Sequence, residues 1–196
     1  MLHPFWAAGF SFARGHFVIQ VPYDQHLPMV FQGEEISIGL RAFTHGYDFY
    51  AIERGVCFHM YAMAENLERR KAVPKFWENA GALYQGAITV SMKRLNTIIG
   101  MADWPTREWP QQDKDLYGLG GVRNTSTFFK SFGIHVDTHT VEPRLCFFVA
   151  TLMMKIFLPA LRENGMGLDY GKINYVYEDP FSSKKLRSIN KATAKN

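Results

Sequence analysis

The stretch "FQGEEISIGLRAFTHGYDF", residues 31–49, fixes where one helix of this chain must begin. Gly33 permits a sharp backbone turn, and Glu34 and Glu35 follow it, where the positive end of a helix dipole favours carboxylates. At 100° per residue the apolar residues fall on one stripe, which consists of Ile36, Leu40 and Phe43. We therefore predict a helix that starts at Glu34 and turns this stripe toward the core.

The opposite side of the same helix carries Glu34, Arg41 and His45 together with Ile38. Because an isoleucine is out of place in bulk water, we expect this side to line a cleft. Two interpretations of Glu34 and Glu35 stay open on spacing alone. They are ordinary acids of a first helical turn, or they are ionised groups that accept hydrogen bonds from a substrate hydroxyl.

The surrounding chain alternates between β-rich and helical patterns. The run "HFVIQVPYD", residues 16–24, reads as a strand closed by a proline, and "YDFYAI" and "GVCFHMY" read as two more. Residues 74–100 read as a long helix with Gly100 as its C-cap, and a further helix is expected from about Thr125. The predicted class is α/β, a sheet with packed helices.

The chain of 196 residues has a formal charge of +4, and the charge is concentrated at its end. Residues 182–196 hold five of the 22 basic residues and no acid, which leaves 17 basic against 18 acidic residues, a net charge of −1, in residues 1–181. We expect one folded region over 1–181 and a disordered basic tail over 182–196. A nucleic-acid-binding arm is the less favoured alternative, and no nucleic-acid partner is predicted.

Two features bear on the compartment. Cys57 and Cys146 are the only cysteines; each lies in an apolar run, where we expect a buried thiol, and they form no disulfide framework. A reducing, cytoplasmic location is therefore favoured. The apolar block of residues 145–161 is interrupted by Lys155 and Pro159, so a buried or interface helix is preferred over a membrane span.

His59 is the candidate metal ligand that we prefer, and Asp48 and Glu53 lie close enough in sequence to share a metal. His59 lies in "VCFHMY", where alternation places Cys57, His59 and Tyr61 on one face of the predicted strand. The other interpretation is a core or interface histidine whose ring nitrogens are hydrogen-bonded within the protein. The sequence has no H-x-H or H-E-x-x-H pattern, so no complete metal site follows from motifs.

Several motifs in order nevertheless resemble one family. They are "WAAGFSF", "VPYDQHLP", "FQGEEI", "RAFTHGYDF" and "HMY" between Trp6 and Tyr61, followed more thinly by "FWE", "SMKRLNTIIG" and "YGLGGVR". Together they are similar to the catalytic core of N-acetylglucosaminyltransferases related to the cytoplasmic enzyme that glycosylates hydroxyproline in protists.

The resemblance implies the C-terminal part of a GT-A type nucleotide-diphospho-sugar transferase fold with an incomplete sheet. It implies UDP-GlcNAc as donor, a protein hydroxyl as acceptor, retention of anomeric configuration and a divalent metal, expected to be Mn²⁺. The residues it assigns are the following: Glu34 and Glu35 as catalytic, Gly33, Arg41, Tyr23 and Asp24 as substrate-binding, and His59 as metal ligand. Arg41 is expected to fix the Glu34 carboxylate in preference to meeting the diphosphate.

The sequence departs from the family in one respect. The nucleotide-binding half and the Asp-x-Asp motif expected before "WAAGF" do not occur in it. We therefore expect a fragment that is inactive alone and transfers GlcNAc when its N-terminal half is present. The alternative is a non-catalytic remnant that binds protein or glycan.

Overall fold

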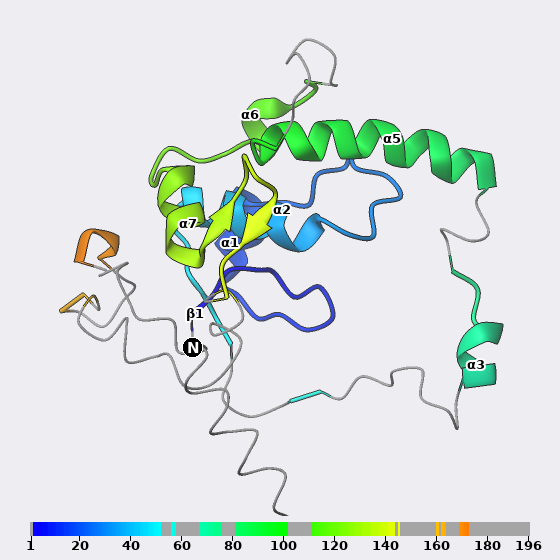
Figure 1. The fold of residues 1–196 in the computed structure, drawn as a ribbon, viewed down its shortest axis with the longest axis horizontal. Helices are drawn as coiled ribbons and strands as arrows, with labels where there is room; N and C mark the ends of the chain where they lie inside the picture. Colours follow the sequence, from blue (N-terminus) through cyan, green and yellow to red (C-terminus); the bar gives the residue numbers. More distant parts are fainter. Residues whose placement is uncertain are drawn as a thin grey trace, which may run out of the picture.

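The computed structural model describes residues 2–51, 56–57, 67–75, 81–101, 111–143, 145, 160, 162–163 and 169–172. These residues are mostly helical, with two small antiparallel strand pairs (Figure 1). The helices are α1 (Gly15–Gln20), α2 (Glu34–Thr44), α3 (Leu67–Ala72), α5 (Gly81–Ile98), α6 (Lys114–Tyr117), α7 (Thr125–Phe132) and the short 3-10 helix η4 (Tyr170–Lys172). The strands are β1 (Leu2–His3), β2 (Phe49–Tyr50), β3 (Ile134–His135) and β4 (Thr140–Val141).

Helix α2 lies at the centre of the described structure. It begins at Glu34, as predicted, and every residue from Ser37 to Thr44 is buried. The predicted core stripe is confirmed: Leu40 and Phe43 are in the main apolar cluster, and Ile36 packs against it. This cluster also contains side chains of α5 and α7, namely Leu95, Phe128 and Phe132, with Ile99 and Ala160. Three helices therefore share one core.

The opposite side of α2 is covered by protein. Ile38 and Ala42 form a second buried cluster with Phe17 and Val21, which belong to α1 and the residue after it. The prediction that this side avoids bulk water is right, but protein packing covers it where an open cleft was expected. The cause is α1, which occupies the space beside α2.

The predicted strand at residues 16–24 is wrong. Residues 15–20 form α1, and the carbonyl oxygen of Phe17 accepts a hydrogen bond from the N–H of Val21 at 2.8 Å. Phe17 and Val21 are four residues apart, so a helical turn brings both to the second cluster. Val18 and Ile19, which suggested a strand, are 64% and 74% exposed. Packing of one apolar pair outweighs the local β preference.

Two later helices occur where the sequence predicts them, although the first does not cover the whole predicted range 74–100, because residues 74 and 75 are not helical. Helix α5 ends at Ile98, and Gly100 adopts the left-handed conformation (φ +78°) expected just past a helix end. Its described part begins at Gly81, and residues 76–80 lie outside the description. Helix α7 begins at Thr125, as predicted, and the side chain of Asn124 accepts a hydrogen bond from the N–H of Ser126 at 2.8 Å.

The strands are short. Leu2 lies opposite Tyr50 and His3 opposite Phe49, and a second pair joins β3 to β4. The strand expected in "YDFYAI" is thus present as two residues, while most of "GVCFHMY" lies outside the described residues. The structure confirms a mixture of helices and strands, and the GT-A arrangement stays a prediction.

Two expectations about the surface can also be compared. Cys57 is exposed, contrary to the burial expected from its apolar run, and Cys146 lies outside the described residues. Among the helices in the described ranges, none is long and apolar enough to cross a membrane.

Candidate active site at the start of helix α2

The turn before α2 depends on a glycine. Gly33 precedes the helix with φ +108°, a conformation that residues with a Cβ rarely adopt. A Cβ built at this position would lie 3.0 Å from Leu95 Cδ1 of α5, so the space is also restricted. The sharp turn predicted from the sequence is confirmed, and it places Glu34 and Glu35 in the first turn of the helix that follows.

Glu34 and Glu35 sit together in the first turn of α2. Glu35 Oε2 accepts a hydrogen bond from the N–H of Gly33 at 3.4 Å. Burial raises the pKa of Glu34, and the charge of Glu35 raises it further, against a lowering by a backbone hydrogen bond. Glu34 Oε2 is buried, and within the described ranges it has no hydrogen-bond partner. The two carboxylates therefore differ in environment although they are adjacent.

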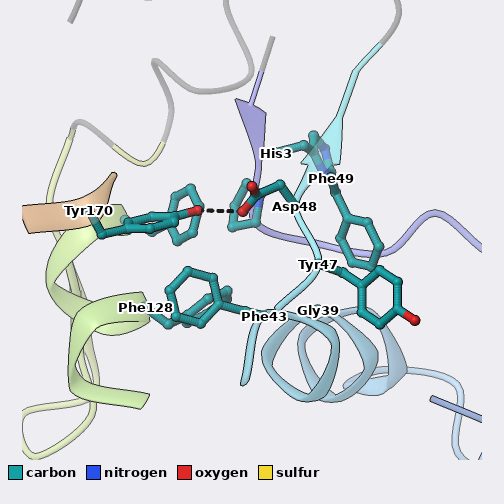
Figure 2. Close-up of a pocket in the computed structure, with 10 residues that line it drawn as sticks. His3, Gly39, Phe43, Tyr47, Asp48, Phe49, Phe128 and Tyr170 are labelled. Atoms are coloured by element: carbon teal, nitrogen blue, oxygen red, sulfur yellow. Dashed lines mark hydrogen bonds between the residues drawn. The ribbon is translucent and has the colours of Figure 1, made fainter. Parts of the chain in front are cut away.

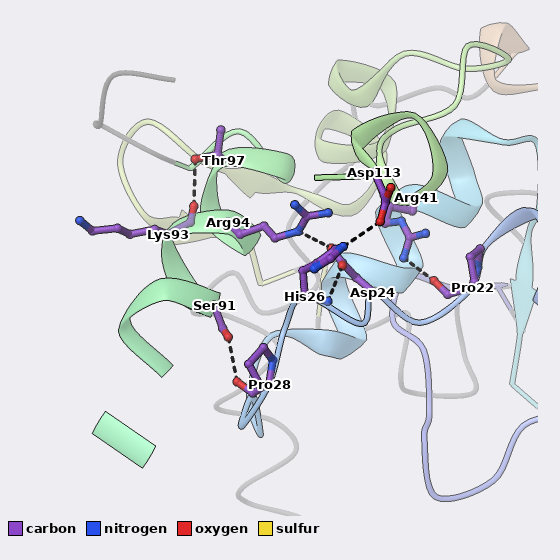
Figure 3. Close-up of polar contacts among 10 residues, drawn as sticks. All are labelled: Pro22, Asp24, His26, Pro28, Arg41, Ser91, Lys93, Arg94, Thr97 and Asp113. Carbon is purple, nitrogen blue, oxygen red and sulfur yellow. Dashed lines mark hydrogen bonds and ion pairs between the residues drawn. The ribbon is translucent and has the colours of Figure 1, made fainter. Parts of the chain in front are cut away.

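Arg41 does not fix the Glu34 carboxylate. Its side chain is 1% exposed, and its Nη1 donates to the carbonyl oxygen of Pro22 at 2.8 Å (Figure 3). Seven residues of helix separate it from Glu34, a rise of about 10 Å, which explains why the two do not pair. Its guanidinium lies 5.9 Å from the ring of Tyr117, and burial lowers the pKa of Arg41 to about 10. Burial and the charge of Arg41 also lower the pKa of His45.

Asp24 faces inward. Its Oδ2 accepts from Nε of Arg94, on α5, at 2.6 Å, and the two side chains are 1% and 0% exposed (Figure 3). Its Oδ1 accepts from the N–H of His26 at 2.9 Å, which closes a local turn. The structure thus occupies both oxygens of Asp24 with protein donors, where the sequence pointed to a substrate contact.

Tyr23 faces outward and is linked through Trp6 to the backbone of Glu35. It is 58% exposed, and its hydroxyl accepts a hydrogen bond from Trp6 Nε1 at 2.7 Å. The backbone N–H of Trp6 donates to the carbonyl oxygen of Glu35 at 3.0 Å. Trp6 therefore connects the Tyr23 hydroxyl to the backbone of the first turn of α2.

The predicted metal ligand cannot be placed. His59 lies outside the described residues. Across the described ranges, no group of three or more His, Cys, Asp or Glu side chains could hold a metal ion. The residues placed by the structure therefore do not make up a metal site by themselves.

A second polar group lies at the other end of α2. Asp48 pairs with Arg123 at 2.6 Å. It also accepts a hydrogen bond from the Tyr170 hydroxyl at 2.7 Å (Figure 2). Burial and the charge of Asp48 raise the pKa of Tyr170. The adjoining cavity measures about 10 Å³, which is near the space of one water molecule. It is too small for a sugar.

Arg94 and Trp6 are the residues that sequence reasoning missed. A signal for Arg94 was present: Ser91, Arg94, Leu95 and Ile98 share one helical stripe of α5 and are all buried. Two polar residues on the apolar side of a helix indicate buried polar contacts. Trp6 carried no comparable signal, because its contact with Glu35 joins two backbone groups.

Comparison with known proteins gives the family. Searches of curated proteins and of solved structures returned no match. The model of one family, described as Glycosyltransferase (GlcNAc), matches residues 1–138, which include Glu34, Glu35 and the helices around them. Since the match covers well over half of the 196 residues, this chain belongs to the GlcNAc glycosyltransferase family.

Proposed function

We propose that this chain is the acceptor-side part of a cytoplasmic transferase that moves GlcNAc from UDP-GlcNAc to a protein hydroxyl, such as that of hydroxyproline. The transfer retains anomeric configuration, depends on a divalent metal and requires a nucleotide-binding half. Membership of the GlcNAc glycosyltransferase family supports the class of reaction. The donor, the acceptor and the metal come from the resemblance of the sequence motifs.

The observation that carries this proposal is the arrangement of Gly33, Glu34 and Glu35. Two carboxylates leave a restricted turn at the positive end of a buried helix, so their backbone positions are fixed before a substrate arrives. Positioning of reactants is a large part of catalysis by transferases that lack a covalent step. A fixed carboxylate that accepts a hydrogen bond from an acceptor hydroxyl would supply such positioning.

We assign different roles to the two carboxylates. Glu34 Oε2 is buried and has no hydrogen-bond partner among the described residues, so a substrate hydroxyl that reached it would satisfy this oxygen. Glu35 already accepts from the Gly33 N–H and holds Trp6 through its backbone carbonyl. Glu34 is therefore the proposed substrate contact, and Glu35 supports the turn.

The proposal of a metal is supported by the resemblance of the sequence motifs alone. His59 is proposed as a ligand of Mn²⁺, which accepts imidazole and carboxylate ligands. The described residues offer no complete ligand set, so the remaining ligands would come from the nucleotide-binding half. When bound, such an ion would neutralise the charge of the departing diphosphate.

The test compares two isosteric substitutions in the chain combined with its nucleotide-binding half. Glu34→Gln should lower the release of UDP from UDP-GlcNAc in the presence of acceptor by about 10²-fold or more, because the amide is a weaker acceptor. Glu35→Gln should be tolerated. Glu68→Gln, a change of an exposed carboxylate on α3, is the control and should leave the rate unchanged.

Two outcomes would count against the proposal. Normal turnover in both Glu34→Gln and Glu35→Gln would show that the carboxylates have no role at the acceptor. Absence of transfer by the wild-type protein, with retained binding of acceptor protein or glycan, would identify a non-catalytic binding module.

A further inference from the structure

The twelve residues 22–33, between the residue that caps α1 and Glu34, have no helix or strand of their own, yet they are held at several points. The carbonyl oxygen of Pro22 accepts from Arg41 Nη1, and that of Pro28 accepts from Ser91 Oγ, both at 2.8 Å. A loop of this length is well above the median for compact domains, and still longer loops without regular structure frequently serve function. We call residues 22–33 the entry loop, because it leads into α2.

Asp24 is the most deeply buried anchor of the entry loop. Its Oδ2 pairs with Arg94, while its Oδ1 and its carbonyl oxygen accept from the N–H groups of His26 (2.9 Å) and Leu27 (3.1 Å). One residue thus connects the loop's internal turn to α5. A second contact, His26 Nε2 to Asp113 Oδ2 at 2.9 Å, is partly exposed and adds little by comparison.

Helix α5 contacts the entry loop at three positions. Ser91 and Arg94, on one buried stripe of α5, meet the loop at Pro28 and Asp24 (Figure 3). Leu95, on the same stripe, lies next to Gly33. The contact at Gly33 is directly before Glu34. The position of the first turn of α2 relative to α5 is therefore linked to the position of Asp24.

A buried ion pair is a costly way to gain stability. Two charges lose their hydration on burial, and replacing such a pair by apolar side chains of similar size is often neutral or stabilising. An Nε–H···Oδ2 bond does, however, fix direction and distance, which apolar contacts do not. The Asp24–Arg94 pair is thus better explained by placement of the loop than by stability.

We propose that Arg94 is a positioning residue of the transferase site. Through Asp24 it holds the entry loop on α5, and through the loop it sets where Gly33 turns and where the carboxylates of Glu34 and Glu35 leave the backbone. The catalytic consequence rests on the function proposed above. The placement of the entry loop by Arg94 does not depend on that function, and it can be measured separately.

Amide hydrogen exchange by NMR tests the placement. Arg94→Met should accelerate exchange of the His26 and Leu27 N–H groups about tenfold more than that of Gly133, whose N–H is bonded to Phe129 at the end of α7. The matched control is Arg123→Met, which breaks another largely buried Arg–Asp pair of 2.6 Å at the far end of α2. Arg123→Met should not accelerate exchange of the His26 and Leu27 N–H groups more than that of Gly133.

Uniform acceleration at His26, Leu27 and Gly133 would overturn the proposal, because it would show only a global loss of stability. If Arg94→Met fails to fold, the double variant Asp24→Leu/Arg94→Met replaces the pair by apolar side chains. We expect this variant to fold and still to exchange faster in the entry loop. Wild-type protection of the loop in a folded double variant would overturn the proposal as well.

A kinetic measurement separates positioning from plain stability. Arg94→Met should lower kcat for UDP release with a smaller change in KM, and Arg94→Lys, which keeps a charge for Asp24, should restore part of it. Local loosening of the loop with wild-type kcat would refute the catalytic role. If the wild-type chain transfers no GlcNAc, the function proposed above fails, while the exchange data still decide the placement.

Discussion

Substitution of Gly39 by alanine should destabilise the protein, although alanine is the better helix former. Gly39 lies in the buried middle of α2, directly under the backbone of Pro4. A Cβ at this position would overlap the carbonyl oxygen of Pro4 and approach Phe5 Cα to 3.4 Å. Because a backbone group cannot rotate away, the N-terminal residues would have to lift from α2.

The magnitude follows from two opposing effects. Overpacking costs about 1–3 kcal/mol, and a clash with backbone belongs at the upper end of that range. The helix preference of alanine over glycine returns up to about 1 kcal/mol. We expect Gly39→Ala to lose about 2 kcal/mol of unfolding free energy, which lowers the Tm by about 4–8 °C in a protein of this size.

Gly86→Ala provides the matched control. Gly86 is exposed within α5, and a Cβ there would meet no atom within 4 Å. The same substitution should therefore raise stability, by about 0.5–1 kcal/mol. Urea unfolding followed by circular dichroism measures both variants. If Gly39→Ala were as stable as the wild type, or if both variants lost stability equally, the close approach of Pro4 to α2 would be wrong.

Three further predictions concern single side chains. Because the pKa of Glu34 is raised in the folded protein, this group should stabilise the fold most at low pH, and the free energy of unfolding should fall as pH rises from about 4.5 to the raised value. The urea midpoint should therefore fall less across this pH range in Glu34→Gln than in the wild type. Parallel curves for the two proteins would contradict the pKa shift. Asn124→Ala removes the cap on the Ser126 N–H and should cost about 1 kcal/mol, whereas Asn124→Ser should cost less; equal losses would argue against the capping bond. His59→Ala should weaken the Mn²⁺ dependence of transfer, and an unchanged metal titration would remove His59 from the site.

The helices were predictable where their signals are local. A glycine, two acids and an apolar stripe placed the start of α2 at Glu34, and α7 begins at Thr125 as expected. The strand predicted over residues 16–24 failed because α1 forms to bury Phe17 and Val21 beside α2. The neighbour that decides this lies about twenty residues later in the chain, beyond the reach of a local pattern.

The candidate site was predictable to the same extent. The turn at Gly33 and the first-turn position of Glu34 and Glu35 follow from adjacent residues. The partner of Asp24 cannot be read from adjacent residues, because Arg94 lies 70 residues away and only the fold brings the two together. A carboxylate in a motif is recognisable from sequence, but whether it points toward a substrate or a buried arginine depends on long-range packing.

Arg123 has a consequence for the order in which the chain assembles. Its guanidinium binds the carbonyl oxygens of Gly46 and Tyr47 as well as Asp48, and so fixes the path by which the chain leaves α2. These contacts span 75–77 residues. A growing polypeptide therefore reaches residue 123 before that exit can be set. The first fifty residues, which carry Glu34 and Glu35, thus complete this part of their structure only with a residue far along the chain, and contacts of such long range slow folding relative to local ones.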